Sequence, residues 1–140
     1  MVVVDGQGVP LGGTIASASP AEVKLAEETI NTIKVPRKGR GRPKKRPERI
    51  IADKGYDSDN LRIRLSFLSI HLISPHKKNR KNAYKQQDRV MVRYKRRWIV
   101  ERTFSWLSSF RRLVVRYDRL VTLYRAFFHL ACIIITLRRF

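Results

Sequence analysis

The chain has 140 residues, of which 43% are hydrophobic, so it can build the core of about one domain and wholesale disorder is not expected. Its 31 Lys and Arg residues against 11 Asp and Glu give a formal net charge of +20. The positive charges of such a chain repel one another unless an anionic partner is near. Nucleic acid is the first candidate, before an acidic membrane surface or a ribosomal-type structural role. A single cysteine excludes an internal disulfide framework and is typical of a reducing cytoplasm.

The beginning of the chain predicts a pair of strands followed by a helix. Residues 2–4 are β-branched, and residues 9–15 form a second apolar run after a glycine-containing turn. Ser19 is typical of a helix cap, and Glu22 completes a capping box with it. Apolar residues then recur at helical spacing.

Residues 35–49 predict a basic loop. Three prolines and two glycines within this range forbid a regular helix. Arg40 and Arg42 alternate with glycines in a short segment that resembles an AT-hook core, which lays arginines into a narrow minor groove. The alternative is a solvated linker that touches phosphates without specificity.

The middle of the chain predicts a strand, a helix and a second strand. Residues 50–52 form an apolar strand that ends at Asp53, and residues 70–73 form the second strand. Either Asp57 or Ser58 is expected to cap the helix between them. The leucines that this helix carries on one face are Leu61, Leu65 and Leu68.

The last part of the chain predicts a basic loop and two helices. The loop over residues 74–87 contains Lys77, Lys78 and Arg80 and suits a nucleic-acid backbone. A long helix is expected from about residue 88 to 110, and a final helix from about 120 to 137. The apolar segment 126–137 is shorter than the roughly 20 residues that span a bilayer, so it predicts a buried helix.

This order of elements is an α/β pattern with a leading hairpin. It places Asp53 at the carboxyl end of a strand, where open α/β sheets usually have their sites. Tyr94, Arg97 and Glu101 are spaced by three and four and therefore share one helix face. Glu101 stands among apolar residues, where a carboxylate is costly to bury unless it is paired or metal-bound. The alternatives are a surface ion pair between Arg97 and Glu101 and a turn cap at Asp53.

If Asp53 and Glu101 converge beside basic residues, their hard oxygen atoms suit Mg²⁺. Two such ions activate a nucleophile and stabilise the leaving oxygen at a phosphodiester. Most designs of this kind need a third carboxylate, and the local candidates are Asp5, Asp57 and Asp59, none of which stands out. The three histidines are scattered, so a structural zinc site is not expected.

Two motifs in this order resemble bacterial insertion-sequence transposases of the DDE type (the insertion-sequence 4/5-type superfamily). Residues 50–59 read IIADKGYDSD, and residues 94–107 read YKRRWIVERTFSWL. The likeness continues through FRRLVVRY at 110–117 and begins at VVDGQGVPL at 3–11. It covers nearly the whole chain, and the paired motifs are far more specific than either one.

The resemblance implies an RNase H-like (retroviral-integrase-like) domain that cleaves and joins DNA with Mg²⁺. It implies that Asp53 and Glu101 are the second and third catalytic, metal-binding carboxylates, and that Tyr94 and Arg97 contact DNA phosphate near the cut. Many relatives have a lysine seven residues after the glutamate, where this chain has Ser108. A cytoplasmic, nucleoid-associated protein with DNA as its partner, and no membrane, follows from the same likeness.

The family's first catalytic aspartate lies on a central strand that precedes the segment matching residues 2–5. We therefore expect residues 1–140 to be a partial catalytic domain, lacking that strand, that binds DNA but is catalytically incomplete by itself. An upstream transposase segment or another copy of the chain would complete it. The alternative function is a non-catalytic, basic nucleic-acid-binding protein, which explains the net charge equally well.

Overall fold

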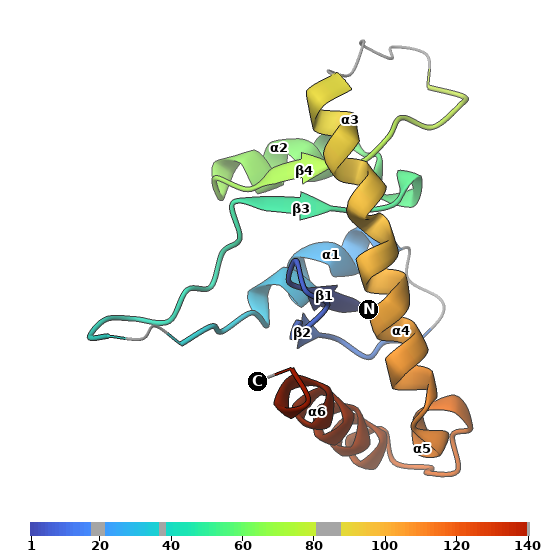
Figure 1. Ribbon diagram of the computed structural model, residues 1–140. Helices are drawn as coiled ribbons and strands as arrows, with labels where there is room; N and C mark the ends of the chain where they lie inside the picture. Colours follow the sequence, from blue (N-terminus) through green and yellow to red (C-terminus); the bar gives the residue numbers. More distant parts are fainter. Residues whose placement is uncertain (18–21, 37–38, 81–87, 140) are drawn as a thin grey trace.

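The structure is a computed structural model that describes residues 1–17, 22–36, 39–80 and 88–139 (Figure 1). Its elements in chain order are β1 (Val2–Val4), β2 (Pro10–Gly13), α1 (Glu22–Asn31), β3 (Arg49–Ile51), the 3₁₀ turn η1 (Lys54–Tyr56), α2 (Asp59–Phe67), β4 (His71–Ile73), α3 (Asp88–Tyr94), the 3₁₀ turn η2 (Lys95–Arg97), α4 (Trp98–Ser108), α5 (Arg111–Val114) and α6 (Val121–Leu137).

The predicted leading strand pair is confirmed. Strands β1 and β2 are antiparallel, and β2 is shorter than the predicted run over residues 9–15. The Asp5 carboxylate closes the turn between them, because its Oδ1 accepts the backbone N–H groups of Gln7 at 2.8 Å and Val9 at 2.9 Å. Gly8 adopts a φ of 87° there, a left-handed conformation that favours glycine.

Gly8→Ala tests how tightly this turn is packed. A Cβ at position 8 would lie 3.0 Å from Thr103 Oγ1 and would add the cost of a positive φ. We expect the free energy of unfolding to fall by about 1–3 kcal/mol in urea denaturation. Gly39→Ala is the matched control, because a Cβ there meets nothing within 4 Å, and an equal loss of stability in both variants would contradict this packing.

The second sheet pairs β3 with β4 in parallel through the crossover helix α2. Leu61 and Leu65 of α2 are the most deeply buried residues of the core, which also takes in Ile30 and Ile33 from α1 and its C-terminal extension. Ser58 caps α2, since its hydroxyl accepts the N–H of Leu61 at 3.5 Å. The predicted strand–helix–strand order is therefore confirmed.

The predicted long helix is confirmed with an interruption. It begins at Asp88 and ends at Ser108, and a 3₁₀ turn over residues 95–97 divides it into α3 and α4. The short helix α5 has no counterpart in the sequence prediction. The predicted helix cap at Ser19 lies outside the described residues, and α1 begins at Glu22.

The C-terminal helix α6 matches its predicted bounds but not its predicted burial. Phe128, Ala131 and Ile135 are buried in a second core with Leu107 of α4, whereas Leu130 and Ile133 on the other side are each 53% exposed. The expectation of a buried helix over residues 126–137 was therefore wrong on one face. The physical reason is that no described element packs on that side. None of the described helices is both long and apolar enough to cross a membrane.

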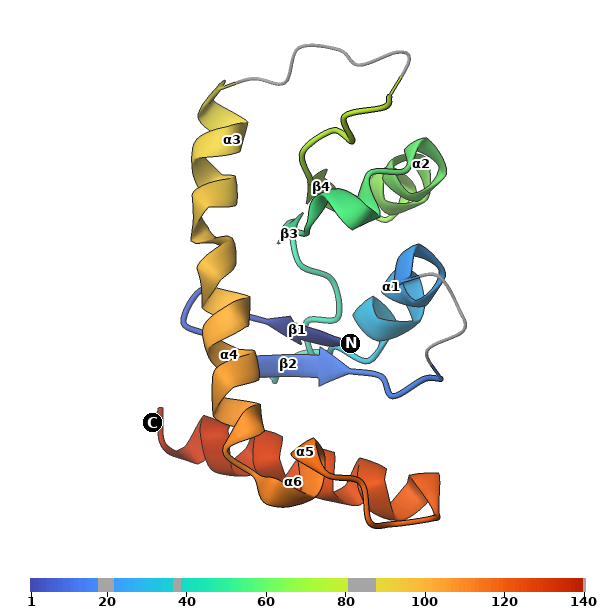
Figure 2. The same cartoon turned by 90° about the vertical axis from the view of Figure 1, so that its right-hand side faces the viewer.

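The whole is a mixed α/β fold with two small sheets. The long helix joins them, because α3 contacts β4 and α4 contacts β1 (Figure 1). Figure 2 shows α6 on the far side of the β1–β2 sheet from β3 and β4. Gly12 and Gly13 let helices approach β2 closely, since a Cβ at these positions would collide with Thr32 of the segment after α1 and with Phe128 of α6.

Candidate functional site

Asp53 lies at the carboxyl end of the parallel β3–β4 sheet, as the sequence predicts. Its Oδ1 accepts the N–H of Lys54 at 2.7 Å, so the side chain caps the turn η1. The Ser74 hydroxyl donates to the Asp53 carbonyl at 2.7 Å, which ties the ends of the two strands together. The carboxylate itself is exposed. Asp53 is thus both a turn cap and an acid presented to solvent.

Tyr94 links this sheet edge to the long helix. Its hydroxyl donates to Asp53 Oδ1 at 3.2 Å across 41 residues of sequence. Burial raises the pKa of the Tyr94 phenol, Arg97 opposes that rise, and the hydrogen bond to Asp53 with the charges of Asp53 and Glu101 adds to it. Both carboxylates therefore act on one hydroxyl group, which stays protonated and able to donate at neutral pH.

Glu101 forms the ion pair that its spacing predicts. Arg97 Nη2 lies 2.8 Å from Glu101 Oε1, and the Arg97 guanidinium also lies 5.9 Å from the Tyr94 ring centre. The apolar neighbours of Glu101 in the sequence do not bury it, because its side chain is 55% exposed. The buried face of α4 is formed by Ile99, Thr103 and Leu107 instead. Glu101 points to solvent beside Arg97 and Tyr94.

The residues that follow Glu101 fasten α4 to the β1–β2 turn. Arg102 Nη2 donates to the Gln7 carbonyl at 2.7 Å, and the Thr103 hydroxyl donates to the Gly8 carbonyl at 2.8 Å. The Arg102 guanidinium also stacks between the rings of Trp98 and Trp106, at 4.8 and 4.9 Å. These contacts between α4 and the β1–β2 turn were not predicted from the sequence. The one local indication was that two polar residues, Arg102 and Thr103, follow Glu101 directly.

Asp57 is a buried hub, whereas the sequence predicted it only as a helix cap or a candidate third carboxylate. Its side chain is 1% exposed and accepts from the N–H of Lys77 at 3.0 Å, from Arg62 at 3.0 Å and from Arg80 at 2.8 Å, with His76 at 3.2 Å. Burial alone would raise the pKa of Asp57, but these hydrogen bonds outweigh it and hold the pKa well below its ordinary value. The hub anchors the loop after β4.

The predicted DNA-contacting residues fall at two places. Lys77 and Lys78 are exposed in the loop after β4, at the same sheet edge as Asp53. Arg40 and Arg42 are exposed in the basic loop, which an antiparallel bridge between Val35 and Lys44 closes at its base and which leads into the opposite end of β3 (Figure 1).

Arg80 differs from the other predicted DNA-contacting residues. Its guanidinium donates to Asp57 and to Asp59, and these bonds raise its pKa further. Within the described structure, these bonds of Arg80 hold the loop after β4, which carries the exposed Lys77 and Lys78.

The donor set suits a magnesium ion only in part. Asp53 and Glu101 offer hard carboxylate oxygens, the type of ligand that Mg²⁺ prefers. No group of three acids, histidines or cysteines that could hold a metal occurs among the residues described. The three candidate third carboxylates are occupied, since Asp5 closes its turn, Asp57 is the buried hub and Asp59 pairs with Arg80. Two candidate carboxylates are present, and a complete metal site needs more ligands.

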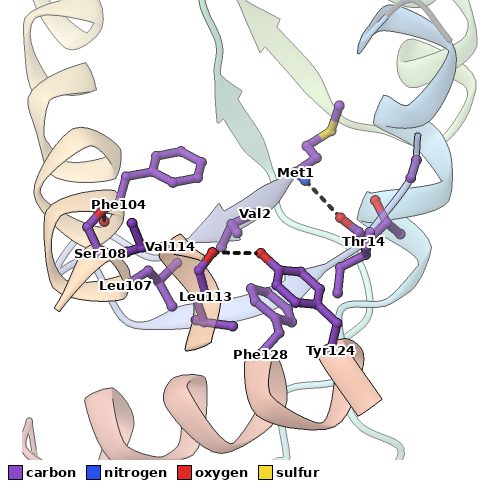
Figure 3. A pocket seen from close by; sticks show the side chains of 12 residues that line it. Met1, Val2, Thr14, Phe104, Leu107, Ser108, Leu113, Val114, Tyr124 and Phe128 are labelled. Atoms are coloured by element: carbon purple, nitrogen blue, oxygen red, sulfur yellow. Dashed lines mark hydrogen bonds between the residues drawn. The ribbon is translucent and has the colours of Figure 1, made fainter. Parts of the chain in front are cut away.

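A separate apolar pocket of about 400 Å³ lies between the β1–β2 sheet and the C-terminal helices (Figure 3). Val2, Leu107 and Phe128 line it, and the Tyr124 hydroxyl donates to the Leu113 carbonyl beside it at 2.9 Å. Neither Asp53 nor Glu101 lines this pocket. Asp53 and Glu101 are both exposed, so the candidate site lies on the surface at the sheet edge.

Comparison with known proteins identifies the family of the chain. The family model described as "Transposase DDE domain" matches residues 1–136. This chain belongs to the DDE transposase family. It is 35% identical over 141 residues to a protein of Burkholderia cepacia named "Putative transposase for insertion sequence element IS402". The match covers 99% of this chain and 63% of that relative, so this DDE domain spans under two thirds of the relative's length. No solved structure matches the chain.

Proposed function

We propose that this DDE transposase domain takes part in Mg²⁺-dependent cleavage and joining of DNA strands, with Asp53 and Glu101 as two of the metal-binding carboxylates. The hydrogen bond from Tyr94 to Asp53 carries the proposal. It joins the strand end that bears one acid to the helix that bears the other. Both acids are exposed, and both raise the pKa of the Tyr94 hydroxyl, so they lie on the same side of the molecule as this link.

The proposed role of each side chain follows from its chemistry. Bound Mg²⁺ would lower the pKa of the attacking water or hydroxyl and stabilise the leaving oxygen. Arg97 holds Glu101 in place at 2.8 Å and carries positive charge to the same surface, where a phosphate would be attracted. The neutral Tyr94 hydroxyl orients Asp53. Lys77 and Lys78 are suited to neutralise backbone phosphates that approach this edge.

The remaining carboxylate, the first of the family's three, is proposed to come from a further strand between β1 and β3, in an RNase H-like sheet. Each of these two strands pairs with a single neighbour within the described structure, β1 with β2 and β3 with β4. Unpaired backbone groups along a strand edge are a template for another strand. A strand in this position would deliver an acid near Asp53 and complete the metal ligands.

Metal binding tests the proposal without depending on DNA cleavage. We expect Mn²⁺, followed by electron paramagnetic resonance as a substitute for Mg²⁺, to bind the wild-type chain weakly and to lose about tenfold in affinity in Asp53→Asn or Glu101→Gln. Asp59→Asn is the matched control, because its carboxylate is 68% exposed nearby and pairs with Arg80. Equal binding by all four proteins would refute the assignment of these two acids.

A non-catalytic nucleic-acid-binding protein is the second candidate function. The net charge of +20 and the exposed Arg40 and Arg42 favour it. It predicts DNA binding that weakens steeply with salt and does not change when divalent metal is removed by chelation. The transposase proposal predicts that Asp53→Asn weakens metal binding about tenfold. DNA affinity at a given salt concentration should be retained or increased, since one negative charge is lost.

A further inference from the structure

Glu101 lies just beyond an interruption of the long helix. The 3₁₀ turn η2 separates α3, which contacts β4, from α4, which contacts β1. A 3₁₀ stretch within a helix is a common place for a hinge. Tyr94 holds the end of α3 to Asp53, but it lies before this turn. Contacts made by α4 itself are therefore needed to fix the position of Glu101 relative to Asp53.

Three consecutive carbonyl groups of the β1–β2 turn accept hydrogen bonds from side chains of the long helix. The bonds run from Arg96 to Gly6 at 3.3 Å, from Arg102 to Gln7 at 2.7 Å and from Thr103 to Gly8 at 2.8 Å. They are called the turn contacts below. Each joins residues 90 or 95 positions apart in the chain. Two of the three donors directly follow Glu101, so the turn contacts hold the helix next to this acid.

The β1–β2 turn is a firm anchor for these bonds. The Asp5 carboxylate accepts two of its backbone N–H groups, and the Asp5 carbonyl accepts the N–H of Gly8 at 3.2 Å. A Cβ at Gly8 would lie 3.2 Å from the Trp106 ring and 3.3 Å from the Arg102 guanidinium, so α4 packs closely on the turn. Gly8 and Thr103 are both buried, and water is poorly placed to replace the bond between them.

The turn contacts determine the direction in which Glu101 points. Successive residues of an α-helix are rotated by about 100°, so holding Arg102 and Thr103 against the turn fixes the rotation of α4 about its axis. Glu101 is thereby kept on the exposed side. The ion pair with Arg97 cannot do this, because it is a partly exposed contact within one stretch of helix and moves with that helix.

We propose that Arg102 and Thr103 are positioning residues, which hold the Glu101 carboxylate through the β1–β2 turn at the place where a metal ligand is needed. This inference rests on the proposed function, because it takes Glu101 to be a metal-binding acid. Ligands must be held within about 0.5 Å of the productive geometry, so the groups that hold them govern metal affinity. Neither positioning residue is a ligand itself, since Arg102 is a cation and the Thr103 hydroxyl already donates to a carbonyl.

The position of α4 gives the first test, and it needs no metal. Spin labels at Asn60→Cys on α2 and Ser105→Cys on α4, both exposed positions, can be attached in a Cys132→Ser background. Double electron–electron resonance should give one narrow distance distribution for this chain and a broader or shifted one after Thr103→Val, which lacks the hydroxyl. Thr103→Ser should restore the narrow distribution. A distribution that Thr103→Val leaves unchanged would overturn the proposal.

The affinity for Mn²⁺ gives the second test and separates this inference from the proposed function. Thr103→Val should lose about tenfold in affinity, and Thr103→Ser should stay within about twofold of the wild type. In a Glu101→Gln background, Thr103→Val should cause no further loss, because a positioning residue acts only through that carboxylate.

The outcomes of this comparison are distinct. If Glu101→Gln itself leaves Mn²⁺ binding unchanged, the proposed function fails. If Glu101→Gln weakens binding, but Thr103→Val lowers the affinity equally in both backgrounds or in neither, this inference alone fails.

Arg102→Met gives a third test through the sign of its effect. The substitution removes a positive charge next to Glu101, and electrostatics alone would then tighten the binding of a cation. Positioning predicts the opposite, a loss of about tenfold in Mn²⁺ affinity, because the bond to the Gln7 carbonyl is lost. An affinity that rises in Arg102→Met would contradict the positioning role.

Thr136→Val is the matched control for these variants. The Thr136 hydroxyl donates to the Cys132 carbonyl at 2.7 Å within α6, as Thr103 does to the carbonyl four residues before it in α4. The control should change neither the Mn²⁺ affinity nor the distance distribution, and equal losses in Thr136→Val and Thr103→Val would refute the assignment. Circular dichroism shows whether each variant is folded. If Thr103→Val is not, Arg102→Met decides the question.

Discussion

Glu101→Gln is expected to abolish DNA cleavage, by about a thousandfold or more, while the protein stays folded. The substitution keeps the size and hydrogen-bonding reach of the side chain and removes the negative charge that would bind the metal. The ion pair with Arg97 is solvent-exposed, so its loss should change the free energy of unfolding by less than about 1 kcal/mol. This variant should therefore lose DNA cleavage and keep nearly the stability of the wild type.

The assay requires a protein in which the site is complete. We would fuse the chain to the part of the Burkholderia relative outside the 63% that the match covers, and follow nicking of supercoiled plasmid with Mg²⁺. Glu28→Gln is the control, because Glu28 is an exposed glutamate on α1. DNA binding by Glu101→Gln should equal that of the unsubstituted fusion. Cleavage retained within tenfold of that fusion would remove Glu101 from the catalytic role.

Asp57→Asn is expected to cause the largest loss of stability among single substitutions at the sheet edge. The neutral amide cannot accept from Arg62, His76, Arg80 and Lys77 together, and the two guanidinium groups would stay largely shielded from water without their counter-charge. Breaking a buried ionic cluster in this way costs about 3 kcal/mol. For a chain of this length, the melting temperature should fall by about 10 °C.

The pH dependence of stability gives an independent check of the same hub. The folded-state pKa of Asp57 lies below its ordinary value of 3.8, so the unfolded chain binds the proton first. The stability that Asp57 contributes is therefore complete above about pH 5 and is lost as the pH falls through 3.8 towards the folded-state pKa. The difference in melting temperature between wild type and Asp57→Asn should shrink in that range. Asp59→Asn, whose carboxylate is exposed, should melt nearly as the wild type does, and a difference that is constant with pH would argue against the hub.

The order of the elements could be predicted from local sequence because it depends on local physics. Short apolar runs, a turn with glycine and the helical spacing of Leu61 and Leu65 each depend on residues that are near neighbours in the sequence. The same is true of the ion pair between Arg97 and Glu101, which lie four residues apart on one helix. The resemblance of residues 50–59 and 94–107 to DDE transposases also needed no coordinates, and the family match confirmed it.

Contacts across the chain needed the tertiary structure. The motif of Tyr94 predicts a phosphate contact, and it gave no sign that the hydroxyl also donates to Asp53, which is 41 residues away. The sequence placed Glu101 among apolar residues without deciding its burial, and the direction in which α4 packs turns Ile99 and Leu107 inward and leaves Glu101 in solvent. Periodicity defines the faces of a helix but does not say which face meets the core when several are apolar.

The acids of the sheet edge show the same division. By itself the sequence determined which residues carry a charge, that Asp53 follows a strand, and that Glu101 shares a helix face with Arg97. Only the tertiary structure decided that Asp57 is buried and hydrogen-bonded while Asp53 stays exposed. The reason is that the loop after β4 folds back, so that Lys77 and Arg80 donate hydrogen bonds to the Asp57 carboxylate. A carboxylate is sorted into a structural or a chemical role by the donors that surround it, and those donors come from distant parts of the chain.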